Sequence, residues 1–336
     1  MSDTMKRAIA SHLERNAQAL VLLHKAASFS HCRYPVDFTN RLAMGLPHLN
    51  NVHRGVRLLL LEAVLHAENG EADEASQSVL CSLALTNSLA AEPLEISQLV
   101  RFACHRIAVT RLERVLNRAR LTDSSLNELE VGFSRLNVSD SLLRGNIGER
   151  CFGIEWCKRP TESILAPLGN LPPPPRLKLK VALLRATGFL DIFLLRYLED
   201  TENYRQVCSM PFPQGVKHTK DADSPMPLTR SFLMSGIWRL GSGRTTVQQA
   251  ALISAHVDVC RTCLAIESYR AANAALPGSL VDLGTKFLKD QPTDPFDGQP
   301  LRYKKLAKGY VVYSVGEDGK DDGGDEKKDI TFTVER

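Results

Sequence analysis

The strongest constraint on the fold is a change of hydrophobic spacing at residues 276–278, Leu-Pro-Gly. Before it, apolar residues recur at the three- to four-residue spacing of amphipathic helices, most continuously from Val247 to about Asn273. After it, short alternating stretches predict strands at Leu301–Lys305, Gly309–Val315 and Ile330–Val334. The sequence therefore predicts an α+β protein, in which a large helical N-terminal region precedes a long helix that leads into a small antiparallel sheet.

The length of 336 residues fits about two domains. We predict an α-helical bundle or solenoid-like domain over residues 1–171 and a helix-plus-sheet domain over residues 247–336. Residues 172–246 are predicted to hold a proline linker, a helix and a long loop. The linker is the four-proline run 172–175, which favours an extended polyproline II spacer, and the loop is Val207–Thr229, which contains four further prolines.

Charge and hydropathy exclude several classes of partner. The 42 basic and 38 acidic side chains give a net charge of +4, which is too balanced to indicate a nucleic-acid-binding protein. The most apolar stretches, such as Val181–Leu198, are interrupted by charged residues, so no membrane span is predicted in this chain. The chain also begins within a helical pattern, as the remainder of a longer protein with an N-terminal anchor would, and the sequence leaves that alternative open.

No arrangement of residues indicates an enzyme. Asp294 and Asp297 have the spacing of paired catalytic carboxylates, but Pro295 and Gly298 beside them favour a turn. The eight cysteines lie mostly within apolar helical patterns, where reduced, buried thiols are expected. The pair Cys260–Cys263 has zinc or redox spacing without a second ligand pair nearby, so helix packing is favoured. The nine histidines show no pairing at metal-ligand spacing.

The acids are concentrated in one short segment. Residues 317–329 contain seven acids and three lysines, a net charge of −4, so the other residues together carry +8. Glycines among these acids allow the backbone to turn tightly, and calcium prefers six to eight carboxylate and carbonyl oxygens. The sequence therefore predicts a calcium site in this loop; the alternative is a solvated acidic loop without an ion. The candidate ligands are Ser314, Asp318, Asp321, Asp322, Asp325 and Asp329.

The spacing within the loop differs from that of an EF-hand. With Asp318 at position one, Asp322 falls at position five and Asp329 at position twelve. Lys320 occupies position three, where a ligand is expected, and an aspartate replaces the usual bidentate glutamate. Strands rather than helices are predicted on either side, so the loop is interpreted as an acidic connection between strands.

The C-terminal quarter resembles the type II secretion major pseudopilin. The resemblance lies in the order and spacing of short elements. They are Ala-Ile-Glu-Ser-Tyr-Arg at 265–270, Leu-Pro at 276–277, Asp-Pro-Phe-Asp-Gly at 294–298 followed by Leu-Arg-Tyr at 301–303, Gly-Tyr-Val-Val-Tyr-Ser-Val-Gly-Glu-Asp-Gly at 309–319, and Asp-Ile at 329–330, where the loop closes. It covers about residues 247–332. The resemblance implies a long helix packed on a small antiparallel sheet, with a calcium ion holding the loop between the last strands.

The sequence also departs from that family. A pseudopilin begins with a cleavable leader and a strongly apolar helix, whereas the equivalent helix here is internal and contains His256, Asp258 and Arg261. What the resemblance implies is therefore the C-terminal fold and its calcium loop, rather than membership of a filament.

Two functional hypotheses follow. The first is a non-enzymatic binding or assembly protein with a calcium-binding, pseudopilin-like C-terminal domain, associated with a secretion system or the cell envelope. It places the protein outside the cytoplasm, provided that an N-terminal anchor is missing from this chain. The second is a soluble helical scaffold or adaptor that binds a protein or peptide, with a purely structural C-terminal domain; without an anchor, this protein is cytoplasmic.

Overall fold

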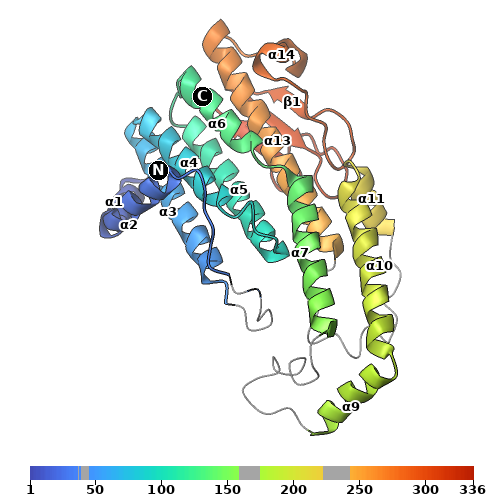
Figure 1. The fold of residues 1–336 in the computed structure, drawn as a ribbon. Helices are drawn as coiled ribbons and strands as arrows, with labels where there is room; N and C mark the ends of the chain where they lie inside the picture. Colours follow the sequence, from blue (N-terminus) through green and yellow to red (C-terminus); the bar gives the residue numbers. More distant parts are fainter. Residues whose placement is uncertain (37, 39–44, 159–174, 222–242) are drawn as a thin grey trace.

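The computed structural model describes residues 1–336 with the exception of 37, 39–44, 159–174 and 222–242, and it confirms the α+β class. Most described residues are helical, and one three-stranded sheet lies near the C-terminus (Figure 1). The α-helices are α1 (Asp3–Arg15), α2 (Ala17–Ala27), α3 (Pro47–Asn69), α4 (Ala72–Asn87), α5 (Glu95–Leu116), α6 (Asp123–Ser134), α7 (Val138–Lys158), α9 (Pro175–Ala186), α10 (Phe189–Ser209), α11 (Gln214–Asp221), α13 (Gly243–Asn273) and α14 (Gly284–Phe287).

The N-terminal helices pack as successive neighbours. Helices α3 and α4 form a hairpin around Gly70, and α5 and α6 continue the layer toward the centre of the molecule (Figure 1). The buried face of α3 includes Val52, Val56, Leu60 and Ala63, which recur every three or four residues. Burial of this stripe against α4 and α5 explains why the segment is a helix and how it is oriented.

Helix α13 lies at the centre of the fold. It contacts α5, α6 and α7 as well as strands β2 and β3. The four consecutive residues 263–266 are all buried, so apolar contacts surround the helix instead of following one stripe. The contacts of α13 with helices on one side and with β2 and β3 on the other account for the burial of this stretch.

The sheet is antiparallel with strand order β1–β2–β3, and its strands are Arg302–Lys305, Tyr310–Ser314 and Ile330–Val334. Tyr310 pairs with Val334, and the phenolic O–H of Tyr310 donates a 3.1 Å hydrogen bond to Oε1 of Glu267 on α13. The face of β2 that carries Tyr310 therefore packs on the long helix. A short 3₁₀ turn, Leu280–Leu283, precedes α14 and connects α13 to the sheet.

One core joins the helical region to the sheet. Leu112 and Val115 of α5, Phe133 of α6, Leu264 of α13 and Phe332 of β3 belong to the same buried cluster. The domain boundaries at residues 171/172 and 246/247 stay a prediction. Elements of residues 1–171 and of residues 247–336 nevertheless share one apolar interior. In the part of the chain that the structure describes, no helix is long and apolar enough to cross a membrane.

The prediction of a long surface loop over Val207–Thr229 is wrong for the first half of that segment. Helix α10 continues to Ser209, and α11 occupies Gln214–Asp221. Val207 and Val216 are buried, so tertiary packing overrides the loop preference that the prolines indicated. The rest of that segment, residues 222–229, lies outside the described residues. So do residues 172–174 of the predicted proline spacer, and α9 begins at Pro175.

Candidate functional site

The acidic loop connects β2 to β3 and folds back over the outer face of the sheet. Gly324 has φ +84° and its backbone lies against Tyr313, so that a Cβ at this position would be 3.2 Å from Cδ1 of the ring. The left-handed backbone favours glycine here, and the short distance to the ring leaves little room for a side chain. A Cβ at Gly324 would also lie 3.6 Å from Cγ1 of Val311, so the loop covers the face of β2 that carries Val311 and Tyr313. All five residues of β2 are buried.

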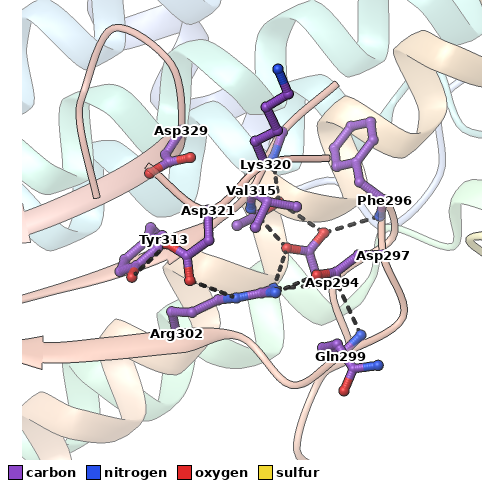
Figure 2. A network of polar contacts seen from close by, with 12 residues as sticks. Asp294, Phe296, Asp297, Gln299, Arg302, Tyr313, Val315, Lys320, Asp321 and Asp329 are labelled. Atoms are coloured by element: carbon purple, nitrogen blue, oxygen red, sulfur yellow. Dashed lines mark hydrogen bonds and ion pairs between the residues drawn. The ribbon is translucent and has the colours of Figure 1, made fainter. Parts of the chain in front are cut away.

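Asp294 connects the turn before β1 to the start of this loop. Its carboxylate is completely buried and accepts four hydrogen bonds, two on each oxygen (Figure 2). The donors are the backbone N–H of Phe296 at 3.0 Å, the hydroxyl of Ser314 at 3.0 Å, the backbone N–H of Val315 at 2.8 Å and Nη1 of Arg302 at 2.8 Å. The turn predicted at this position is present, and it also anchors the end of β2.

Arg302 lies between three carboxylates (Figure 2). In addition to Asp294, it pairs with both oxygens of Asp297, and its Nε lies 3.8 Å from Oδ2 of Asp321 in the acidic loop. Burial lowers the pKa of the guanidinium, but the hydrogen bond and charge of Asp297 outweigh that effect and raise it. One partly buried cation thus links β1, the preceding turn and the acidic loop.

Two of the predicted calcium ligands have internal partners. Asp321 accepts a 3.1 Å hydrogen bond from the hydroxyl of Tyr313, and burial together with this contact raises the pKa of Tyr313 to about 12. Asp322 forms a 2.8 Å ion pair with Lys328, whose pKa is raised by the contact. These carboxylates are directed to different neighbours, Asp321 toward the sheet and Asp322 toward the end of the loop.

The next three predicted ligands make local contacts: two acids stabilise the backbone of the loop, and Ser314 contacts the turn before β1. Asp318 accepts a hydrogen bond from the N–H of Lys320 at 3.0 Å, and Asp325 accepts one from the N–H of Lys327 at 2.9 Å. Both acids are exposed and make Asx-type turns. The hydroxyl of Ser314 donates to Asp294, so it belongs to the turn network rather than to the acidic loop.

Asp329 differs from the other acids of the loop because it is only 6% exposed. Its Oδ2 accepts a 2.8 Å hydrogen bond from the N–H of Gly324. Its Oδ1 is buried and has no hydrogen-bond partner among the described residues. A buried carboxylate oxygen without a donor is unfavourable, which makes this atom the best position in the loop for a cation.

The six predicted ligands are not brought to one point. Among the residues that the structure describes, no three His, Cys, Asp or Glu side chains are grouped closely enough to hold a metal ion. The sequence reasoning also missed the organising roles of Arg302 and Tyr313. Their alternating positions in strands were visible, but nothing local to the sequence showed that Asp321 would turn toward them.

The Cys260–Cys263 pair lies in the core beneath the sheet. Both residues are completely buried, and Sγ of Cys263 lies 4.0 Å from the carbonyl oxygen of Phe332. Burial raises the pKa of each thiol well above its usual value, which keeps both protonated. This environment fits the helix-packing interpretation of the pair.

Comparison of the chain with protein-family models, with curated proteins and with solved structures gave no match.

Proposed function

We propose that the protein is a non-enzymatic binding or assembly component whose C-terminal domain, similar to a pseudopilin, binds calcium in the loop between β2 and β3. The observation that carries the proposal is the buried Oδ1 of Asp329, which lacks a donor within an acidic, glycine-rich loop. A hard divalent cation would neutralise this oxygen and reduce the repulsion within a segment of net charge −4.

The residues fit such an ion in part. Oδ1 of Asp329 has no donor but is buried, so the loop would have to open for an ion to reach it, whereas Asp318 and Asp325 are exposed carboxylates of the same loop. Asp322 would have to exchange Lys328 for the metal, which is feasible because exposed ion pairs contribute little to stability. The chemistry that calcium supplies here is structural, since it would fix the loop against β3.

The proposed location follows from the expected affinity. Weakly binding calcium loops of extracellular modules fill at about 0.1 to 1 mM calcium, a concentration found outside the cytoplasm. We therefore propose a place in the cell envelope, in association with a secretion system and a protein partner.

Calorimetric titration with calcium and thermal melting in 5 mM calcium or in chelator test the metal site. We expect binding at about millimolar affinity and a higher melting temperature with calcium. Asp329→Asn and Asp318→Ala should weaken the binding, whereas Asp290→Asn, at an exposed aspartate outside the loop, should not. An unchanged melting temperature in calcium, with both loop variants indistinguishable from wild type, would refute the calcium proposal.

One observation favours the second candidate function, a soluble scaffold with a structural C-terminal domain. Lys328 and Arg302 already lie near two of the loop carboxylates, so part of the acidic charge is balanced without a metal. On this proposal, the helical region binds a protein or peptide and calcium has no role. The same titration separates the two functions, because the scaffold requires no calcium response.

A further inference from the structure

Three helices bring a thiol, an imidazole and a carboxylate into one line. Sγ of Cys81 on α4 lies 3.3 Å from Nδ1 of His24 on α2. Nε2 of the same imidazole lies 2.7 Å from Oε2 of Glu62 on α3. The hydroxyl of Ser78 donates a 2.9 Å hydrogen bond to that carboxylate oxygen and holds it in place.

For a neutral imidazole, the contacts indicate which ring nitrogen carries the proton. A neutral imidazole carries one N–H, and the short contact to a carboxylate acceptor places it on Nε2 of His24. Nδ1 is then an acceptor directed at Cys81. Burial raises the pKa of the Cys81 thiol, so the sulfur rests as S–H and donates to that nitrogen. This order of nucleophile, base and orienting carboxylate is the one in which a weak nucleophile is activated by an adjacent general base.

Cys81 also borders a groove. Cys81 is only 4% exposed, yet it lines a groove of about 430 Å³ that α4 and α6 form with the end of α2. Ala27, Leu80, Ala84 and Val131 contribute apolar walls. The side-chain amide of Gln77 lines the same groove and donates to Sγ at 3.7 Å, which places a donor beside any developing negative charge on sulfur.

We propose that Cys81 is an acyl-acceptor site, which takes an acyl chain from a thioester donor with His24 as general base and Glu62 as the residue that orients it. The apolar walls of the groove suit the hydrocarbon part of such a group. The product is a covalently acylated protein, formed once per chain, so this site goes beyond the proposed assembly function and does not depend on it.

The step is balanced without any further reactant. The Cys81 thiol transfers its proton to Nδ1 of His24 as sulfur attacks the donor's carbonyl carbon. A new C–S bond forms to Cys81, the donor's C–S bond breaks, and the imidazolium returns the proton to the departing thiolate. Glu62 stabilises the imidazolium while it exists, and no group is oxidised or reduced.

The test uses the full chain and the N-acetylcysteamine thioester of decanoic acid. Intact-mass spectrometry counts the acyl groups, and peptide mapping locates them. We expect one decanoyl group per chain on Cys81, lost in Cys81→Ala. Acylation should slow about 100-fold in His24→Gln, because a positioned general base contributes about 10²- to 10⁴-fold. His66→Gln is the matched control, since His66 also pairs with a glutamate, Glu71, but has no thiol beside it.

Two outcomes would overturn the proposal. The first is acylation confined to the exposed Cys32 and Cys151, which would indicate unassisted surface chemistry. The second is an equal rate at Cys81 in wild type and in His24→Gln. A lower melting temperature in His24→Gln than in His66→Gln would mean that a slower reaction could come from loss of stability. In that case Glu62→Gln serves as the second variant. Glu62→Gln keeps the size of the side chain, and the rate of acylation at Cys81 should fall because the amide no longer stabilises the imidazolium. An unchanged rate would equally refute the proposal.

Discussion

The backbone N–H of Thr333 donates a 2.7 Å hydrogen bond to Oε1 of Glu113, which ties the edge strand β3 to α5 across 220 residues of sequence. Asn117, the residue that follows the last residue of α5, donates to the carbonyl oxygen of Thr333 and accepts from the N–H of Glu335, both at 2.7 Å. Side chains of a helix thus occupy the backbone groups that an unprotected edge strand would offer to another chain.

Asn117→Ala removes two hydrogen bonds to the backbone around β3. We expect the free energy of unfolding to fall by about 1 to 3 kcal/mol, because the Thr333 carbonyl loses a donor in a partly buried position. Urea denaturation measures the loss, and faster hydrogen exchange at Glu335 localises it. Asn127→Ala, on the exposed side of α6, should leave stability unchanged; equal effects of the two variants would contradict the role assigned to Asn117.

Arg302→Met leaves the buried carboxylate of Asp294 without its cation. Removal of one partner of a buried ion pair is strongly destabilising, and we expect a loss of about 3 kcal/mol in the free energy of unfolding. Lys304→Met is the matched control, since Lys304 is an exposed residue of the same strand. A loss no larger than that of the control would show that the backbone donors satisfy Asp294 without Arg302.

Asp258 on α13 should make stability depend on pH. Burial raises the pKa of its carboxyl to about 6, although Ser254 and Arg261 act in the opposite direction. Between the unfolded pKa of about 4 and this value, the folded state binds more protons, so the free energy of unfolding contributed by Asp258 falls as pH rises through 4 to 6. Asp258→Asn should therefore stabilise the protein at pH 7.5 by about 1 to 3 kcal/mol, and hardly at pH 4.

Urea denaturation of wild type and Asp258→Asn at both pH values provides this measurement. The difference between the two proteins is the readout, because other titrating groups affect both alike. Asp290→Asn, at an exposed site, controls for the loss of a charge. A variant that is less stable than wild type at pH 7.5 would mean that the contacts of Asp258 with Ser254 and Arg261 outweigh its burial.

Gly148→Ala tests the contact between α7 and the start of α5. A Cβ at Gly148 would lie 1.5 Å from the carbonyl oxygen of Pro93, so the two segments would have to move apart. We expect destabilisation by about 3 kcal/mol in thermal or urea unfolding. Gly132→Ala on α6 is the comparison, because its nearest neighbour is the flexible end of Leu83 at 2.9 Å. Similar losses in both variants would refute the close approach as the cause.

The local elements could be read from the sequence because their signals are local. The strand predicted at Ile330–Val334 has those bounds in the structure, and the other two strands differ by one residue at their ends. Alternation over five residues sets the face of a strand without reference to the rest of the chain. Over Val207–Thr229 the local signal failed, because the prolines predicted a loop and the burial of Val216 depends on contacts with other elements.

The candidate sites could be predicted only in part, because side-chain direction depends on distant partners. The acids of the loop were visible, but Asp321 turns to Tyr313 and Arg302, and only Asp329 presents a buried oxygen without a donor. The thiol site was not visible at all. Its members come from three helices, with His24 separated from Cys81 by 57 residues, and no spacing rule joins them.

The shared core also has a consequence for synthesis of the chain. Leu112 and Val115 of α5 belong to the same buried cluster as residues of α13 and β3, and β3 lies more than 200 residues further along. At translation rates of 5 to 20 residues per second, these side chains wait roughly 10 to 40 s for their partners. Until then, these apolar side chains lack the neighbours that α13 and β3 provide in the folded protein.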